Sequence, residues 1–458
     1  MKKTNKSIFK ILTLVLIIAL LAGCTPSADK MDSQGKDQSQ ELNVPSKGTE
    51  QTLSDEADPD TDTEADYQNR FLTFATAKAD FDASGAKADP AVQETYRKLG
   101  ELIRGSGNKI IQEIEETSFV FSPMSYYLAF ATLANGATGK GADELKELLT
   151  GSSDHSFDLL NQACGLLIKN LLGNAEFTVD INTMLAGKTE YEFAADFLQK
   201  AVSYYEAVAV KMDFERPESL AELNRWTKEK TRGLIDPLFA EGYKLDPETS
   251  LILINTTYFL GQWEIEFDSD ATYKEVFKGL NNTAEIDMMH DRSLLDYAES
   301  EQWQMVSLKY KGGARMNLYL PKGSVKPKDI LLADKAFETE EADVALTLPK
   351  FDLESKIGLS KILQGLAPSI FTAESLLGIM TYDDEAPVDL MVGDTFQKAR
   401  VKVDEQGTEA AAATVIVAPT AAREPDDNMI ILKFDRPFAW EIVYDNVPLF
   451  TGVVSDLP

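Results

Sequence analysis

The side chains that most often carry enzymatic chemistry are few in this 458-residue chain, and their contexts do not suggest a catalytic group. It contains two histidines, His155 and His290, and two cysteines, Cys24 and Cys164. Nucleophilic catalysis needs a serine or cysteine next to a base, and neither histidine stands in a context that predicts one. The sequence also has no metal-ligand spacing and no phosphate-cradling glycine loop. We therefore expect a protein that is not an enzyme and that uses no metal and no cofactor.

The charge balance narrows the possible partners. The formal net charge is −30, with 75 acidic and 45 basic residues. Nucleic acid would be repelled over most of such a surface. A disulfide framework is excluded if Cys24 is modified as argued below, because Cys164 then stands alone. The fold must therefore be stabilised by its hydrophobic core, and 44% hydrophobic residues is an ordinary content for a globular protein. We expect the protein to be a monomer.

The N-terminus has the features of a secretory signal. Four lysines, Lys2, Lys3, Lys6 and Lys10, precede an apolar run over residues 11–22, which ends in small residues before Cys24. A cysteine directly after Leu-Ala-Gly resembles the bacterial lipoprotein signal. That resemblance implies that residues 1–23 are removed and that Cys24 is acylated, which anchors the protein at the outer side of a bacterial membrane. The alternative is a simple N-terminal membrane helix, although the run is short for a span of about 20 residues.

The chain then divides into a tether and one large domain. Residues 24–66 are acidic and polar with few large apolar side chains, so they cannot bury enough surface to become ordered. Residues 67–458 show no second linker and are expected to form one domain. Within it, residues 81–85 are expected to be a loop, and the spacing over residues 93–103 predicts a helix.

The most informative segment lies near the C-terminus. Glu405 and Gly407 stand in a charged turn, and small residues follow from Thr408 to Thr414. Such a segment can sit outside as a loop or lie flat in a β-sheet, although an alanine run is more often helical. It resembles the hinge and reactive loop of serpins, the serine protease inhibitors whose loop is cut and then inserts into a sheet. The hinge implied by this resemblance consists of Glu405, Gly407, Thr408, Glu409, Ala410, Ala411, Ala412, Ala413 and Thr414.

Other motifs occur in the order expected for that family. Ser122 is a good N-cap for a helix that is apolar almost all round and therefore buried. Residues 251–260 are too apolar for a one-sided strand and predict a central strand covered on both faces. From Asn255 the chain matches the family pattern N-x-x-Y-F-x-G-x-W-x-x-x-F. The resemblance places Trp263 in the breach, at the top of the slot that receives the loop. Residues 437–452 resemble the family's C-terminal hairpin.

The resemblance also implies a shutter, a polar gate beneath the sheet formed by Ser122, Ser125, Asn255 and Gln397. The family usually has a histidine where this chain has Gln397. Alternation over residues 395–403 predicts a half-buried strand with Gln397 on its apolar face. A glutamine amide can bond the hydroxyls of Ser122 and Ser125, so we expect a working gate with altered details.

The fold implied by the resemblance is α+β. It has a large mixed or antiparallel sheet A, smaller sheets B and C, about eight to nine helices and an exposed reactive loop. The implied mechanism is suicide inhibition, in which the loop is cut, inserts into sheet A and traps the protease as an acyl-enzyme. Strand residues alternate faces. The inserted loop would therefore turn inward the residues Thr408, Ala410, Ala412, Thr414 and Ile416.

The family's spacing from Glu405 places the cut between Ala421 and Ala422. Small residues on both sides favour elastase-like or subtilisin-like serine proteases, and cysteine proteases are a further possible target. The alternative cut, between Arg423 and Glu424, favours trypsin-like enzymes. Two other functions remain open, a non-inhibitory serpin-fold binding module and a lipoprotein enzyme or solute-binding protein. The small hinge residues argue against the non-inhibitory binding module. The absence of a catalytic group in the sequence argues against the enzyme.

Overall fold

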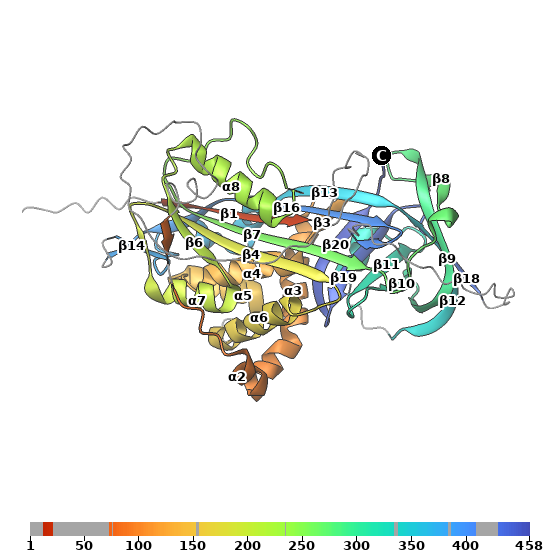
Figure 1. The fold of residues 1–458 in the computed structure, drawn as a ribbon, viewed down its shortest axis with the longest axis horizontal. Helices are drawn as coiled ribbons and strands as arrows, with labels where there is room; N and C mark the ends of the chain where they lie inside the picture. Colours follow the sequence, from red (N-terminus) through yellow and green to blue (C-terminus); the bar gives the residue numbers. More distant parts are fainter. Residues whose placement is uncertain are drawn as a thin grey trace, which may run out of the picture.

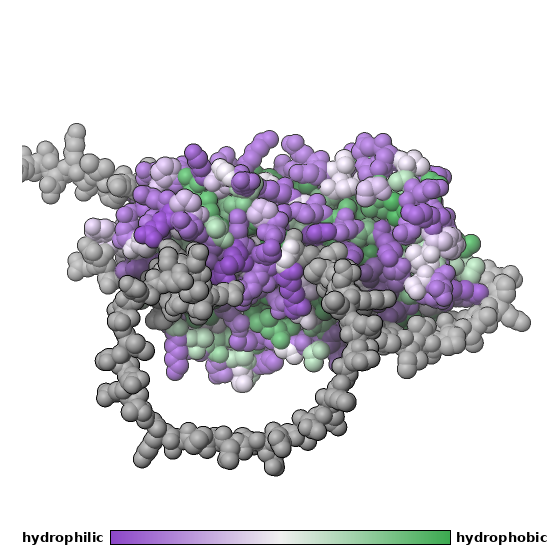
Figure 2. Space-filling view, turned by 45° about the horizontal axis from the view of Figure 1, so that its top comes forward, coloured by the Kyte–Doolittle hydropathy of each residue, from purple (hydrophilic) through white to green (hydrophobic). Residues whose placement is uncertain are grey.

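The computed structural model describes residues 12–21, 73–75, 77–152, 155–233, 235–333, 338–382, 386–408 and 429–458. In these ranges the chain forms three β-sheets and the helices α2 to α10, an α+β architecture (Figure 1). Hydrophilic side chains cover most of the face seen in Figure 2, and hydrophobic patches interrupt them.

The first sheet, sheet A, has eight strands among the described residues, in the order β1-β16-β17-β7-β4-β6-β2, with β13 paired to β16. Its central strand is β7, in which every residue from Thr249 to Phe259 is buried, as the largely apolar sequence of residues 251–260 predicts. The strands are β1 (Leu12–Leu21), β2 (Thr73–Ala75), β4 (Thr178–Lys188), β6 (Val208–Met212), β7 (Thr249–Gln262), β13 (Phe351–Gly358), β16 (Leu390–Asp404) and β17 (Gly407–Thr408).

Strand β1 lies between β7 and β16 and runs parallel to both. The N-terminal apolar run is therefore a strand in this structure and not the helix of the alternative prediction. Among the residues described, no helix is both long and apolar enough to cross a membrane. We call the position between β7 and β16 the insertion slot. That residues 1–23 form a signal remains a prediction.

The second sheet, sheet B, has the order β18-β12-β9-β10-β11-β19-β20-β3, with β8 paired to β9. Its strands are β3 (Phe119–Phe121), β8 (Tyr273–Lys278), β9 (Thr283–Glu299), β10 (Trp303–Lys309), β11 (Arg315–Pro321), β12 (Glu340–Pro349), β18 (Ile430–Lys433), β19 (Phe438–Tyr444) and β20 (Val447–Val454). The small third sheet consists of β5 (Glu192–Phe193), β14 (Met380–Tyr382) and β15 (Ala386–Pro387).

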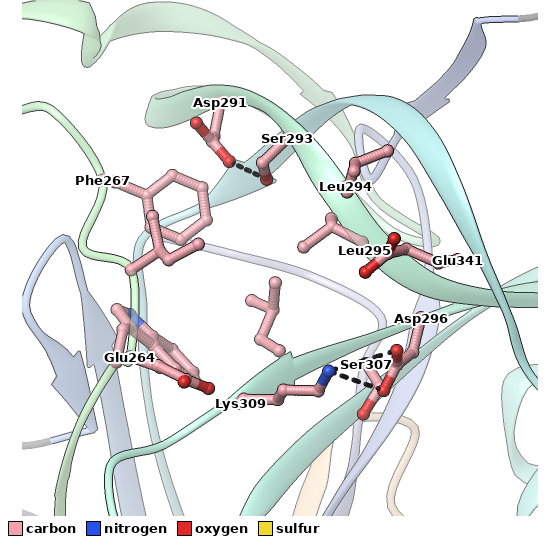
Figure 3. A pocket seen from close by; sticks show the side chains of 13 residues that line it. Glu264, Phe267, Asp291, Ser293, Leu294, Leu295, Asp296, Ser307, Lys309 and Glu341 are labelled. Atoms are coloured by element: carbon pink, nitrogen blue, oxygen red, sulfur yellow. Dashed lines mark hydrogen bonds and ion pairs between the residues drawn. The ribbon is translucent and has the colours of Figure 1, made fainter. Parts of the chain in front are cut away.

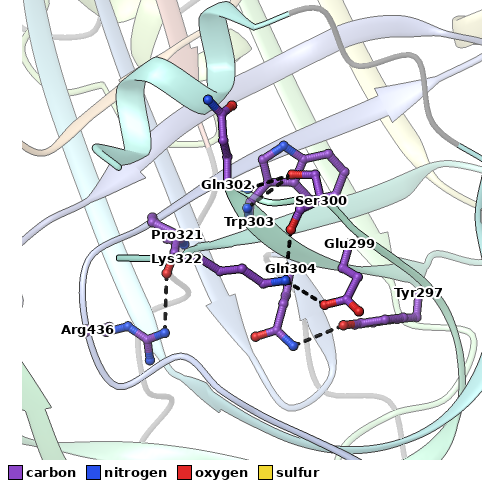
Figure 4. Close-up of polar contacts among 9 residues, drawn as sticks. All are labelled: Tyr297, Glu299, Ser300, Gln302, Trp303, Gln304, Pro321, Lys322 and Arg436. Atoms are coloured by element: carbon purple, nitrogen blue, oxygen red, sulfur yellow. Dashed lines mark hydrogen bonds and ion pairs between the residues drawn. The ribbon is translucent and has the colours of Figure 1, made fainter. Parts of the chain in front are cut away.

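The connection between β9 and β10 is held by several polar contacts (Figure 4). The ammonium of Lys322 donates to the Glu299 carboxylate at 2.6 Å and to the Ser300 carbonyl at 2.9 Å. The amide of Gln304 donates to the Tyr297 hydroxyl at 3.0 Å. These contacts fix the two strands relative to each other at the end where they turn.

Helices cover both faces of sheet A. Alternate residues of β7 point to opposite faces. Leu251 and Leu253 belong to the main core together with α4, whereas Ile252 and Ile254 pack in a second cluster with Leu223 of α8. The helices are α2 (Ala83–Ala88), α3 (Pro90–Glu113), α4 (Pro123–Ala134), α5 (Gly139–Thr150), α6 (Phe157–Leu172), α7 (Ala195–Tyr205), α8 (Pro217–Lys230), α9 (Pro327–Leu332) and α10 (Ser360–Leu366).

The N-terminal end of α4 matches the sequence prediction. Ser122 is the N-cap and its hydroxyl accepts from the Ser125 amide, with Pro123 in the first turn. All helix residues from Pro123 to Leu133 are buried. The expected loop over residues 81–85 is wrong in part, because α2 begins at Ala83. Asp82 accepts from the backbone amides of Ser84 and Gly85 and so caps a helix there.

Candidate functional site

The chain reverses direction at the end of β16 and enters sheet A again as β17. Gly407 pairs with Asp404 of β16 on one side and with Gln262 of β7 on the other, antiparallel to both. Thr408 pairs in the same way with Val403 and Gly261. Gly407 and Thr408 of the hinge are therefore already strand residues in sheet A.

Two residues just beyond β7 bind the turn that precedes β17. The Trp263 amide donates to the Gln406 carbonyl at 2.9 Å, and the Phe267 amide donates to the Glu405 carbonyl at 2.9 Å. The indole N–H of Trp263 donates to the Asp404 carbonyl at 3.0 Å. Its ring stacks on Tyr310, with centroids 4.3 Å apart and 18° between the planes. Trp263 thus contacts the hinge where β7 ends, and its role in the breach stays a prediction.

Thr408 is completely buried, which agrees with its predicted inward orientation. Its hydroxyl is 2.5 Å from the Tyr310 hydroxyl, and either oxygen can be the donor. Tyr310 is buried too, and burial raises the pKa of its phenol well above the ordinary value, although the hydrogen bond with Thr408 opposes this. The phenol is therefore neutral and keeps its proton for this bond.

Gly407 stands where the backbone of β7 comes closest. A Cβ on Gly407 would lie 2.0 Å from the Gly261 carbonyl oxygen, far inside van der Waals contact. Its φ of +155° is also one that L-residues rarely adopt. Only glycine fits between the two strands at this point.

Glu405 is tied to the neighbouring β-structure by an ion pair. Its carboxylate lies 2.8 Å from the ammonium of Lys350, which follows β12. Partial burial acts to raise the pKa of Glu405. The bond from Lys350, together with hydrogen bonds from its own backbone and from Thr272, outweighs this and holds that pKa below its ordinary value. The glutamate of the hinge is therefore an anchoring charge.

Beneath the sheet, Gln397 joins β16 to the start of α4. Its side-chain oxygen accepts from the Ser122 amide at 2.8 Å, and its side-chain nitrogen donates to the Ser122 carbonyl at 3.1 Å. The expectation that Gln397 bonds the hydroxyls of Ser122 and Ser125 is therefore wrong. The reason is that these hydroxyls already have other partners, with Ser122 donating to the Leu449 carbonyl at 2.5 Å.

The rest of the shutter joins α4 to two strands of sheet A. The Ser125 hydroxyl donates to the Asn255 side-chain oxygen at 2.5 Å. The Asn255 amide in turn donates to the Thr183 hydroxyl of β4 at 2.9 Å. All three side chains are buried. The four predicted shutter residues thus form one connected group, and the buried Ser125 has the partner that its position requires.

The comparisons with known proteins agree on one family. The family model described as "Serpin (serine protease inhibitor)" matches residues 107–457. Iripin-5 of Ixodes ricinus is 31% identical over 378 residues, which cover 78% of this chain and 92% of that protein. An uncharacterized serpin-like protein of Thermococcus kodakarensis is 29% identical, covering 82% of this chain and 87% of its own length.

Solved structures show the same fold. The thermophilic serpin tengpin in its native state superposes with a TM-score of 0.69 at 25% identity, covering 80% of this chain and 94% of that one. Serpin48 of the insect Tenebrio molitor gives a TM-score of 0.69 at 25% identity, covering 79% and 98%.

The chain belongs to the serpin family. Members of this family are generally serine protease inhibitors, and some serpins are non-inhibitory. The hinge and the shutter described above lie within the matched residues.

Several predicted site residues of this serpin fall outside the described residues. They are Cys24, the hinge residues Glu409, Ala410, Ala411, Ala412, Ala413 and Thr414, and both predicted cleavage positions, Ala421–Ala422 and Arg423–Glu424. The structure thus describes Glu405, Gly407 and Thr408 of the hinge and all of the predicted shutter and breach residues.

The two histidines and Cys164 of the serpin do not form a catalytic group in the described ranges. His155 is exposed, whereas His290 lies with its Nε2 2.9 Å from the Glu275 carboxylate. Cys164 is fully buried, and burial raises the pKa of its thiol to about 12. In the described ranges no three His, Cys, Asp or Glu side chains are grouped closely enough to hold a metal ion.

Sequence reasoning did not identify three partners of the hinge, namely Tyr310, Lys350 and Phe267. Tyr310 is part of a Tyr-Lys-Gly turn after β10, and Lys350 is part of a Leu-Pro-Lys-Phe turn after β12. Both turns are visible in the sequence. Their contact with the hinge depends on how sheet B docks on sheet A, which no local pattern indicates.

Proposed function

We propose that this serpin is a suicide-type inhibitor of serine proteases. The main observation in support is that Gly407 and Thr408 already pair with β7 and β16 as strand residues. The next residues, from Glu409 to Thr414, include four alanines and a threonine. Small side chains can follow Thr408 into the same ladder, because successive strand residues alternate between the two faces and only Glu409 carries a charge.

The chemical step belongs to the protease. Its serine oxygen attacks the carbonyl carbon of the scissile bond, that bond breaks, and the new amine leaves with a proton from the protease histidine. The result is an ester between the protease and the N-terminal part of the loop. Insertion of that part adds backbone hydrogen bonds on both sides, and its length carries the bound protease away before water can cleave the ester.

We place the cut between Ala421 and Ala422 and expect elastase-like or subtilisin-like targets. Cleavage between Arg423 and Glu424 by a trypsin-like protease is the alternative. We also propose that Cys24 carries the lipid that holds the serpin at the outer side of a bacterial membrane, with residues 24–66 as tether.

Loss of residues 1–23 would matter for this mechanism, because β1 lies in the insertion slot. Strand β1 runs parallel to β7 and β16, whereas β17 and any continuation of it run antiparallel. The loop and β1 would compete for the same hydrogen-bonding edges. We therefore expect the form without residues 1–23 to be the active inhibitor.

The test is to incubate that form with pancreatic elastase, subtilisin and trypsin and to separate the products on a denaturing gel. An adduct that survives boiling, with mass spectrometry placing the cut after Ala421, is the expected result. Clean cleavage without an adduct for all three enzymes would contradict inhibition and favour a non-inhibitory module. Thermal unfolding of the nicked protein provides a second measurement, because an inserted loop should raise the melting temperature markedly.

A further inference from the structure

An open cavity of about 200 Å³ lies between the end of β7 and the strands β9, β10 and β12 (Figure 3). Its apolar lining includes the buried rings of Trp263 and Phe267, with Leu295 and Leu308 from sheet B. A protein cavity of about 150 Å³ can hold benzene. The cavity is thus of a size for a small organic molecule, part of which stays outside.

The rim of the cavity is strongly acidic. Four carboxylates line it, those of Glu264, Asp291, Asp296 and Glu341, together with the single ammonium of Lys309. Asp296 is paired with both Lys309 and Arg315, at 3.2 and 3.3 Å. In the described part of the chain neither Glu264 nor Glu341 has an ion-pair partner. Negative charge therefore remains around the opening after the internal pairing is complete.

Two features of this wall are unfavourable without a ligand. Glu341 of β12 stands directly opposite Asp296 of β9 in the antiparallel register, and like charges in that relation repel each other. Lys309 and Arg315 balance the charge of Asp296, so Glu341 is the carboxylate of this pair that has no ion-pair partner among the described residues. The hydroxyl of Ser307, a cavity-lining residue that is only 3% exposed, has no hydrogen-bond partner among the described residues. A ligand cation would balance the charge of Glu341, and a polar head group is the kind of partner that the Ser307 hydroxyl lacks.

We propose that this cavity binds a small amphiphilic cation, a primary ammonium or amidinium group on an aromatic or aliphatic body. The body would pack on Trp263, Phe267 and Leu295, and the cationic head would lie among the rim carboxylates. Sites with apolar walls and a few convergent polar groups are typical of small-molecule binding. Anions and neutral molecules of the same shape lack the electrostatic attraction.

The cavity wall is also part of the hinge site. Trp263 and Phe267 donate their backbone amides to the turn before β17, so a ligand packed on these rings contacts the residues that hold the hinge. Binding should therefore be reported by tryptophan fluorescence. The site itself does not require that the serpin inhibit a protease.

The test uses three isosteric probes, benzylammonium, benzyl alcohol and benzoate, titrated into the folded protein by calorimetry and followed by tryptophan fluorescence. We expect one-site binding of benzylammonium with a dissociation constant on the order of 1 mM. The alcohol and the carboxylate should bind at least roughly tenfold more weakly. Equal affinities for the three probes, or no binding of benzylammonium, would overturn the proposal.

Matched variants locate the site. Glu341→Gln removes a rim charge and should weaken benzylammonium binding roughly three- to fivefold. Glu340→Gln, its exposed neighbour on β12 that does not line the cavity, should leave binding unchanged. Leu294→Lys places a tethered cation at the rim, where Leu294 is 41% exposed, and should abolish measurable binding. Similar effects of Glu341→Gln and Glu340→Gln, or full binding by Leu294→Lys, would show that the cavity is not the site.

Discussion

Tyr310 and Thr408 are joined by a 2.5 Å hydrogen bond between their hydroxyls, although 98 residues separate them in the chain. Both side chains are buried, so water does not compete for the bond. Tyr310 also stacks on Trp263, whose indole binds the last carbonyl of β16. The stacked pair of Tyr310 and Trp263 therefore contacts both the end of β16 and Thr408, so its surroundings depend on whether Thr408 lies in sheet A.

Thr408→Arg should convert the inhibitor into a substrate. Arginine at a position with no exposed surface would bury an unpaired charge, at a cost of about 3–5 kcal/mol. Insertion of the loop would then be slower than hydrolysis of the acyl-enzyme. We expect the yield of boiling-resistant adduct to fall at least roughly tenfold while cleavage of the loop continues.

Thr408→Ser is the matched control for that variant, because it keeps the hydroxyl that meets Tyr310. Its adduct yield should stay close to that of the parent protein. Unchanged trapping by Thr408→Arg would contradict loop insertion through this position.

Gly407→Ala should release the hinge from sheet A. The added Cβ would meet the Gly261 carbonyl oxygen at 2.0 Å, and backbone cannot move aside cheaply. We expect a loss of about 1–3 kcal/mol in the free energy of unfolding and a change in Trp263 fluorescence. Gly365→Ala in α10, where a Cβ meets nothing within 4 Å, should be neutral or stabilising by about 0.5–1 kcal/mol. Equal melting temperatures for the two variants would show that the hinge does not depend on Gly407.

Local sequence patterns predicted much of the fold and of the site. The buried central strand β7, the N-cap Ser122 and the inward orientation of Gln397 were predicted from such patterns, and each is confirmed by the structure. These features depend on residues within a few positions of one another. Burial of Thr408 followed from the same alternation.

Partners across the fold were not predictable in the same way. Gln397 and Ser122 lie 275 residues apart. The Gln397 side chain bonds the backbone of Ser122 and not its hydroxyl, because that hydroxyl already donates to the Leu449 carbonyl. The short helix α2 was missed because one capping aspartate, Asp82, decides it and no 3.6-residue pattern shows. The strand β1 arises from pairing with β7 and β16, and such tertiary pairing overrides local preference.

Gln397→Leu should weaken the shutter. The change removes both bonds to Ser122 and leaves its buried amide and carbonyl without these partners. We expect the free energy of unfolding to fall by about 2–4 kcal/mol, measured by denaturant titration. Gln112→Leu, an exposed position on α3, is the matched control and should change stability by less than about 0.5 kcal/mol. A stability loss no larger than that of the control would show that the amide of Gln397 does not support the gate.

The Glu405–Lys350 pair should make the hinge sensitive to acid. The pKa of Glu405 is lower in the folded protein than its ordinary value of 4.5, so the ionised carboxylate favours folding. That contribution is complete above the ordinary pKa and is lost as pH falls through the lowered one. Glu405→Gln should therefore melt ~2–4 °C below the parent protein at pH 7, and the difference should shrink below about pH 4.5. Lys350→Met removes the same pair from the other side and should give the same profile. A difference that stays constant from neutral pH into this acid range would mean that the carboxylate is not the anchor, and the hinge would then depend on Trp263, Phe267, Tyr310 and the pairing of β17.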